Sequence, residues 1–156
     1  MLTIGDSLPE VTVTGADGAP IALTAYKGKP LVIYFYPKAD TPGCTNEAKD
    51  FSALMGEFEG LGVTVVGVSK DKPAKLAKFA AKYDLSVLLA SDAEPDGVVC
   101  EAFGTWVEKK LYGRAYMGIA RATFLFDAAG TATRVWPAVK VKGHAAEVLE
   151  AARALG

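Results

Sequence analysis

The stretch LVIYFYPKADTPGCTNEAKDF, residues 31–51, contains the features that decide the fold. It opens with an unbroken run of aliphatic and aromatic residues, which predicts a strand buried on both faces of a sheet. Pro37 ends that strand, Pro42 and Gly43 turn the chain, and a helical pattern follows. A buried strand that leads through a turn into a helix is typical of an α/β protein.

The rest of the chain alternates strand-like and helix-like patterns. Strands are expected at 11–13 and 21–23, as a hairpin, and then at 31–36, 63–69, 86–91, 122–127 and 131–136. Apolar residues at three-and-four spacing predict helices at 45 to about 60, 76–83, 98–103 and 145–155. The expected order is β-hairpin, β, α, β, α, β, short α, β, β, α. We therefore expect one α/β domain over residues 1–156, with a central sheet flanked by helices.

Composition excludes several classes of protein. With 51% hydrophobic residues the chain can build a full core, and 17 Lys and Arg against 18 Asp and Glu give no electrostatic reason to bind nucleic acid or an anionic membrane. The N-terminus has no basic segment followed by an apolar one, so a cytoplasmic location is expected. Two cysteines and one histidine are too few for a disulfide scaffold or a structural zinc site.

Cys44 stands where the buried strand has ended and the following helix begins. The first amides of a helix lack partners, and the aligned peptide dipoles place partial positive charge there, so a thiolate is favoured over a thiol. This position also lies at the carboxyl edge of a buried strand, where open α/β sheets place their sites. A lone cysteine elsewhere would be read as a small core residue, but this setting favours chemistry.

Pro37, Thr41 and Cys44 form the pattern PxxxTxxC, and FYPKADTPGCTNEA, residues 35–48, resembles the active-site motif of the peroxiredoxins, in the bacterioferritin comigratory protein or peroxiredoxin Q group. The resemblance extends through IGDSLPEVTV, VVGVSKDKPAKLAKFAAKYDL and EKKLYGRAYMGIARATFLFD to the final helix. It implies a thioredoxin-like fold with a mixed sheet, and a thiol peroxidase that reduces hydrogen peroxide and alkyl hydroperoxides. No metal, flavin or haem is implied, since the thiol does the redox chemistry.

The resemblance also assigns roles to residues. Cys44 matches the peroxidatic cysteine, Thr41 and Pro37 match residues that shape its pocket, and Arg121 matches the arginine that completes the site. Without the resemblance, Arg121 would be read as a surface cation. Glu47, three residues after Cys44, is expected to complement the helix N-terminus without touching the peroxide.

The sequence departs from the group where the oxidised cysteine is resolved. Many members have a second cysteine five positions after the first, and that position is Lys49 here. We therefore expect a one-cysteine mechanism, in which an external thiol such as thioredoxin, glutaredoxin or glutathione reduces the Cys44 sulfenic acid. The alternative is a disulfide between Cys44 and Cys100 that thioredoxin opens. The resemblance suggests a monomer.

Other classes of function fit the sequence less well. A disulfide oxidoreductase would need Cys-x-x-Cys, and CTNE at residues 44–47 fails this requirement. A redox-sensing or holdase-like binding protein on the same fold would need neither Thr41 nor Arg121. We expect His144 on the surface, and Trp106 with the tyrosines of KKLYGRAYMGI, residues 109–119, in a loop packed over the sheet.

Overall fold

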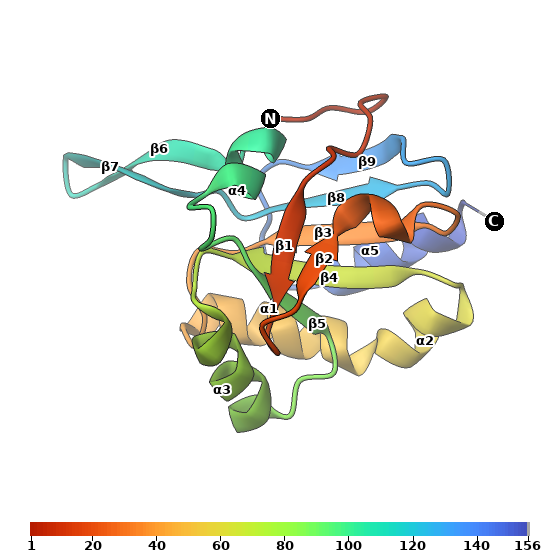
Figure 1. Ribbon diagram of the computed structural model, residues 1–156, viewed down its shortest axis with the longest axis horizontal. Coiled ribbons are helices and arrows are strands. Elements are labelled where there is room, and N and C mark those ends of the chain that lie inside the picture. Colours follow the sequence, from red (N-terminus) through yellow and green to blue (C-terminus); the bar gives the residue numbers. More distant parts are fainter. Residues whose placement is uncertain (156) are drawn as a thin grey trace.

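The computed structural model describes residues 1–155, and its centre is a seven-stranded mixed sheet in the order β2-β1-β5-β4-β3-β8-β9 (Figure 1). A separate two-stranded sheet is formed by β6 and β7. The elements are β1 (Thr12–Gly15), β2 (Pro20–Ala22), the 3-10 helix η1 (Leu23–Tyr26), β3 (Leu31–Phe35), α1 (Pro42–Ala53), α2 (Met55–Gly60), β4 (Thr64–Ser69), α3 (Pro73–Tyr83), β5 (Leu88–Ser91), α4 (Val98–Phe103), β6 (Trp106–Leu111), β7 (Arg114–Ile119), β8 (Ala122–Phe126), β9 (Ala132–Trp136) and α5 (His144–Arg153).

Strand β3 lies inside the sheet, as its unbroken apolar run predicts. It pairs in parallel with β4 and antiparallel with β8, and every residue of it is buried. Strands β4 and β5 are also parallel, whereas β1, β2, β8 and β9 pair antiparallel. The parallel strands β3 and β4 therefore end at one edge of the sheet, and the loops that leave this edge carry the residues of the candidate site.

Alternate residues of β3 enter two different cores. Tyr34 belongs to the core that contains residues of α1, α2, α3 and α5. Phe35 belongs to the core on the other face, with residues of β1, η1 and α4. This division follows from the strand geometry, in which successive side chains point to opposite faces of the sheet.

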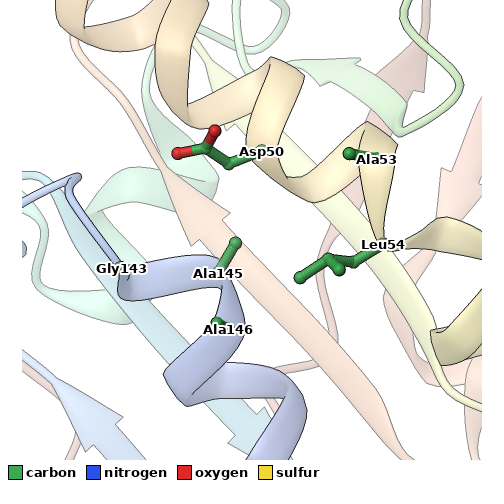
Figure 2. A pocket seen from close by; sticks show the side chains of 6 residues that line it. All are labelled: Asp50, Ala53, Leu54, Gly143, Ala145 and Ala146. Atoms are coloured by element: carbon green, nitrogen blue, oxygen red, sulfur yellow. The ribbon is translucent and has the colours of Figure 1, made fainter.

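Helices α1 and α5 pack against each other on the first of these faces. A shallow cavity of about 300 Å³ lies between them, and Figure 2 shows Leu54 and Ala145 facing each other across it. Only one of the residues that line it, Asp50, is titratable. No helix within residues 1–155 is both long enough and apolar enough to cross a membrane.

The helix predicted from Thr45 to about residue 60 is two helices. It begins earlier, at Pro42, and is interrupted at Leu54, where φ is −102° and ψ is 3°. Glycines are poor helix formers, and Gly56 and Gly60 leave the second part with little intrinsic preference for continuing the first.

The prediction that Trp106 and the tyrosines of residues 109–119 lie in a loop packed over the sheet is wrong. Residues 106–119 form the hairpin β6–β7, which projects beyond the main sheet at the left of Figure 1. Its turn is Tyr112-Gly113, with φ of 52° and 76°, and the positive angles of such a two-residue turn match the twist of the paired strands. Tyr112 is 97% exposed, whereas Trp106 at the base of the hairpin packs against the core.

Candidate active site

The site is assembled where the chain leaves β3 and enters α1. Pro37 is exposed just beyond the strand, and the helix begins at Pro42, whose missing N–H is not needed at that position. Cys44 follows within the first turn and is only 1% exposed. Its amide belongs to the first turn of the helix, where backbone N–H groups have no intrahelical acceptor. The thiol therefore lies beside unpaired donors, as the sequence predicts.

Arg121 immediately precedes β8, and its side chain extends to the Cys44 thiol. Its Nη2 lies 3.3 Å from Cys44 Sγ, so the structure brings these two predicted residues together across the sheet edge. Gly43 makes this approach feasible, because a Cβ at that position would lie 3.2 Å from Arg121 Nη2. A guanidinium beside the sulfur favours the thiolate form and can stabilise negative charge that develops on a bound oxygen.

Glu47 is much closer to the chemistry than its sequence position suggested. Its side chain is 1% exposed, and its Oε1 accepts a hydrogen bond from Arg121 Nη1 at 2.7 Å. Burial raises the pKa of this carboxyl to about 7, although the Arg121 guanidinium acts in the opposite direction. Glu47 thus binds Nη1 of the Arg121 guanidinium, while Nη2 contacts Cys44. The spacing of three residues from Cys44 was the available signal, since it places both side chains on one face of α1.

Thr41 lies at the N-cap position of α1 but does not cap the helix with its side chain. Its hydroxyl instead donates a hydrogen bond to the Lys38 carbonyl at 2.7 Å. The lone pairs of its oxygen remain available, so this hydroxyl can accept a hydrogen bond from a peroxide. This geometry is consistent with the expectation that Thr41 borders the site. The hydroxyl proton of Thr41, however, is already donated to the Lys38 carbonyl.

The loop that carries Thr41 is fixed by residues that sequence reasoning missed. Asp71, after β4, accepts a hydrogen bond from the Ala39 amide at 2.7 Å. Asp40 adopts a positive φ of 63° and accepts hydrogen bonds from Tyr83 Oη at 2.5 Å and Lys82 Nζ at 2.9 Å. The Asp40 contacts join the active-site loop to the C-terminal end of α3, and the Asp71 contact joins it to the segment between β4 and α3. They are long-range in sequence, so no local pattern could have indicated them.

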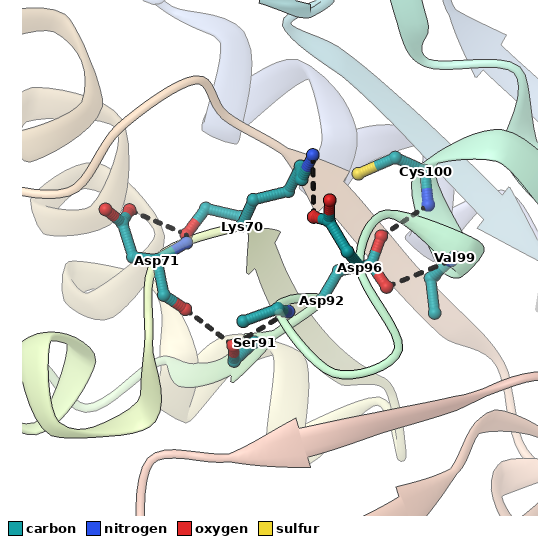
Figure 3. Close-up of polar contacts among 9 residues, drawn as sticks. Lys70, Asp71, Ser91, Asp92, Asp96, Val99 and Cys100 are labelled. Atoms are coloured by element: carbon teal, nitrogen blue, oxygen red, sulfur yellow. Dashed lines mark hydrogen bonds and ion pairs between the residues drawn. The ribbon is translucent and has the colours of Figure 1, made fainter.

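Cys100 is not part of this arrangement. It is fully buried in α4, in the core on the opposite face of the sheet from Cys44. Its backbone N–H donates to Asp92 Oδ2 at 2.7 Å (Figure 3). Burial, with a further contribution from Asp92, raises the pKa of the Cys100 thiol far above its ordinary value. Such a thiol is a poor nucleophile.

The expectation that His144 lies on the surface is wrong. The side chain is buried, and its Nε2 lies 2.8 Å from Thr123 Oγ1 on β8. The rings of Phe51 and Trp136 meet it edge-on. His144 begins α5, and α5 packs against α1, so the residue that the sequence places at a helix start is covered by a neighbouring helix.

Comparisons with known proteins agree on one family. The model of the AhpC/TSA family matches residues 4–135. Peroxiredoxin Bcp of Bacillus subtilis is 44% identical over 96% of this chain and 94% of its own length, and peroxiredoxin Bcp of Escherichia coli is 43% identical over 92% and 90%.

Solved structures agree as well. The bacterioferritin comigratory protein of Xanthomonas campestris, described in a study of its alkyl peroxide reduction activity, superposes with a TM-score of 0.88 at 40% identity, covering 96% of this chain and 98% of that one. BcpB of Mycobacterium tuberculosis gives a TM-score of 0.86 at 34% identity, covering 100% and 99%.

Proposed function

Because the chain belongs to the AhpC/TSA family, as a peroxiredoxin of the Bcp/PrxQ group, we propose that Cys44 is the thiol with which it reduces peroxides. The chain is a thiol peroxidase, and the expected thioredoxin-like fold is confirmed. The observation that carries the assignment to Cys44 is its sulfur's contact with Arg121 at 3.3 Å, at the start of a helix.

The proposed reaction begins with attack of the Cys44 thiolate on one peroxide oxygen. The S–O bond forms as the O–O bond breaks, and the leaving alkoxide takes up a proton to give an alcohol, or water when the substrate is hydrogen peroxide. Cys44 is left as a sulfenic acid. Arg121 can stabilise the thiolate before attack and the charge on the oxygens during it.

Thr41 and the Cys44 amide would orient the peroxide. The amide donates to one oxygen, while the Thr41 oxygen accepts from the peroxide O–H because its own proton is held by the Lys38 carbonyl. Pro37 has no N–H, so it can border the site without competing for these hydrogen bonds. Together they would hold the O–O bond in line with the sulfur, which is what a displacement at oxygen requires.

We extend the substrate to hydrogen peroxide and alkyl hydroperoxides. The Xanthomonas campestris relative is described as reducing alkyl peroxides, and its similarity covers nearly the whole of both chains. Pro37 at the rim is exposed, so a substituent on a bound peroxide would meet solvent there.

We propose that resolution follows the one-cysteine mechanism. Cys44 and Cys100 belong to cores on opposite faces of the sheet, so β3 and its neighbours lie between the two thiols. A disulfide requires Cα atoms about 4.4 to 6.8 Å apart, and we expect that α1 would have to unwind partly to bring Cys44 that close to Cys100. An external thiol such as thioredoxin, glutaredoxin or glutathione then reduces the sulfenic acid. The Cys44–Cys100 disulfide is the alternative.

Intact-mass analysis with peptide mapping tests this proposal. The reduced protein is treated with an equimolar amount of hydrogen peroxide, with and without a sulfenic-acid trap, alongside the Cys44→Ser and Cys100→Ala variants. We expect a trapped adduct on Cys44 in the wild type and in Cys100→Ala, and none in Cys44→Ser. A Cys44–Cys100 linked peptide would favour the two-cysteine mechanism, and absence of oxidation would favour a non-enzymatic redox-sensing or holdase-like role.

A further inference from the structure

A groove of about 410 Å³ lies between the active-site rim and the β6–β7 hairpin. Its lining combines Pro37 of the rim with aromatic and aliphatic side chains and two lysines, Lys70 and Lys109. The aromatic and aliphatic part comprises Trp106, Tyr116, Met117 and Ile119. Apolar walls with a few placed charges are the usual composition of a small-molecule site.

The groove borders the candidate active site at its rim. Pro37 borders both, and Ile119 on the groove wall is followed two residues later by Arg121. Lys109 is close enough to both Cys44 and Arg121 for their charges to act on its pKa. A molecule that fills the groove would therefore lie beside the rim of the site that holds Cys44.

The two lysines differ in how they are satisfied. Lys70 Nζ forms an ion pair with Asp96 at 2.9 Å, visible in Figure 3, and stands 3.9 Å from the centroid of the Trp106 ring. Lys109 forms no ion pair within residues 1–155, although it is partly buried. Burial is the main reason that its pKa is lowered, with Arg121 adding to the effect.

The stem of Lys109 is directed by Gly118 on the neighbouring strand. A Cβ at Gly118 would lie 3.3 Å from Lys109 Cδ and 3.5 Å from its Cε, so the lysine stem packs over bare backbone. The groove thus contains a cation that is held in place, partly removed from water and not neutralised by the described chain. An anionic group on a ligand would supply the missing partner.

Given the one-cysteine mechanism proposed above, on which this inference rests, we propose that the groove binds a carboxylate-bearing low-molecular-weight thiol, with its carboxylate on Lys109 and its sulfur at Cys44. Cys44 and Cys100 belong to different cores, and under the one-cysteine mechanism the Cys44 sulfenic acid depends on a reductant from outside. Hydrogen peroxide is too small to need such a groove. A thiol attached to a carboxylate-bearing body uses both the apolar wall and the cation.

Reduction of the Cys44 sulfenic acid consumes two molecules of the thiol. The first thiolate attacks Cys44 Sγ, an S–S bond forms, the S–O bond breaks, and the departing hydroxide is protonated to water. A second thiolate attacks the outer sulfur of this mixed disulfide and releases Cys44 as a thiolate. The two thiols are oxidised to their disulfide, and the sulfenic acid is reduced.

The test compares glutathione with glutathione diethyl ester, in which the carboxylates are neutralised. The full-length protein is oxidised with equimolar hydrogen peroxide, and the return of reduced Cys44 is followed by rapid quenching and mass spectrometry. Lys109→Met removes the proposed partner and Lys109→Arg keeps its charge. Lys110→Met is the matched control, because it removes the same charge from the next, exposed residue of β6.

We expect Lys109→Met to slow reduction by glutathione about fivefold, the rate effect of one partly buried charge pair, and to leave the ester unaffected. Lys109→Arg should restore the rate, and Lys110→Met should not change it. Equal effects of Lys109→Met on both thiols, or the same loss in Lys110→Met, would overturn the groove as a carboxylate site while the one-cysteine mechanism stands.

Two further outcomes separate the alternatives. Oxidation of Cys44 by linoleic acid hydroperoxide and by its methyl ester is measured in the same variants. If Lys109→Met slows oxidation by the free acid and not by the methyl ester, while it affects reduction by the two thiols equally, the groove receives the peroxide and the proposal is overturned. A Cys44–Cys100 disulfide in the oxidised protein would overturn the one-cysteine mechanism and the groove's role together.

Discussion

Glu47 binds Arg121 through one carboxylate oxygen, at 2.7 Å from Nη1, while its other oxygen is buried with no hydrogen-bond partner among residues 1–155. The contact orients the guanidinium so that Nη2 faces Cys44. Burial opposes ionisation of the carboxyl more strongly than the arginine favours it, which raises its pKa to about 7. The site therefore contains an acid whose charge changes near neutral pH.

The first prediction concerns stability and pH. The pKa of Glu47 is raised in the folded state from its ordinary 4.5, so between about pH 4.5 and 7 the folded protein binds more protons than the unfolded one. Its contribution to the free energy of unfolding must then fall as pH rises through this window, by on the order of 3 kcal/mol.

The Glu47→Gln variant has no carboxyl group at this position and therefore cannot titrate there. Urea unfolding of both proteins at about pH 5 and about pH 8 should show the wild type losing stability relative to the variant. Parallel pH profiles would place the Glu47 pKa near its ordinary value.

The second prediction concerns Arg121. Arg121→Ala removes the cation beside the Cys44 sulfur, and the rate constant for oxidation of Cys44 by hydrogen peroxide should fall about 100-fold or more. Arg121→Lys should recover only part of it, because an ammonium cannot bind Glu47 and Cys44 as a planar fork does. Arg134→Ala is the matched control, since this arginine is exposed and lies over Trp136 instead. Competition kinetics would give these constants, and an unchanged constant in Arg121→Ala would remove Arg121 from the site.

The third prediction concerns the loop that carries Thr41. Tyr83→Phe deletes the hydrogen bond to Asp40 and keeps the ring that packs edge-on against Phe79. Loosening the loop should expose the N-terminal turn of α1, so we expect several-fold faster hydrogen exchange at residues 38–45 and faster alkylation of Cys44 by a bulky maleimide. Tyr112→Phe, at the exposed hairpin tip, should change neither rate. If hydrogen exchange in Tyr83→Phe stays at the wild-type rate, the contacts of Lys82 with Asp40 and of Asp71 with Ala39 are sufficient to hold the loop.

Sequence reasoning succeeded where local pattern determines structure. The apolar run of β3, its proline and the helix that follows place Cys44 at a helix start without any knowledge of the rest of the chain. Arg121 is different, because only the resemblance to a family, and no spacing, could join residues 77 positions apart. The motif could not reveal the burial of Glu47 against Arg121, because the two residues are distant in the sequence.

The remaining errors have two physical origins. The hairpin β6–β7 has weak alternation and a Tyr-Gly turn in place of the usual Asn-Gly, so its local signal was too faint to distinguish it from a loop. His144 is polar and opens a helix, which is typical of a surface residue, yet packing of α5 against α1 covers it. Tertiary contact overrode local preference at His144, whereas at the hairpin the local signal itself was weak.

The last prediction uses His144 as the only histidine of the chain. Burial lowers the pKa of its imidazole to about 4. In the unfolded state the ordinary value of 6.5 applies, so the unfolded chain binds more protons between about pH 4 and 6.5. The stability contributed by neutral His144 is complete above that window and is lost as pH falls through it, by on the order of 3 kcal/mol.

A proton NMR titration of the folded protein should show the single imidazole Hε1 signal unmoved from about pH 8 down to about pH 5.5, whereas in urea it should titrate near 6.5. The slope of its stability has the opposite sign to that of Glu47, and the two windows overlap between about pH 4.5 and 6.5. The wild type should therefore show little net pH dependence there. Removing one of these groups reveals the other: Glu47→Gln should be destabilised by acid, and His144→Gln should be stabilised by it. Midpoint titration of the folded imidazole near 6.5 would instead mean that His144 is open to water.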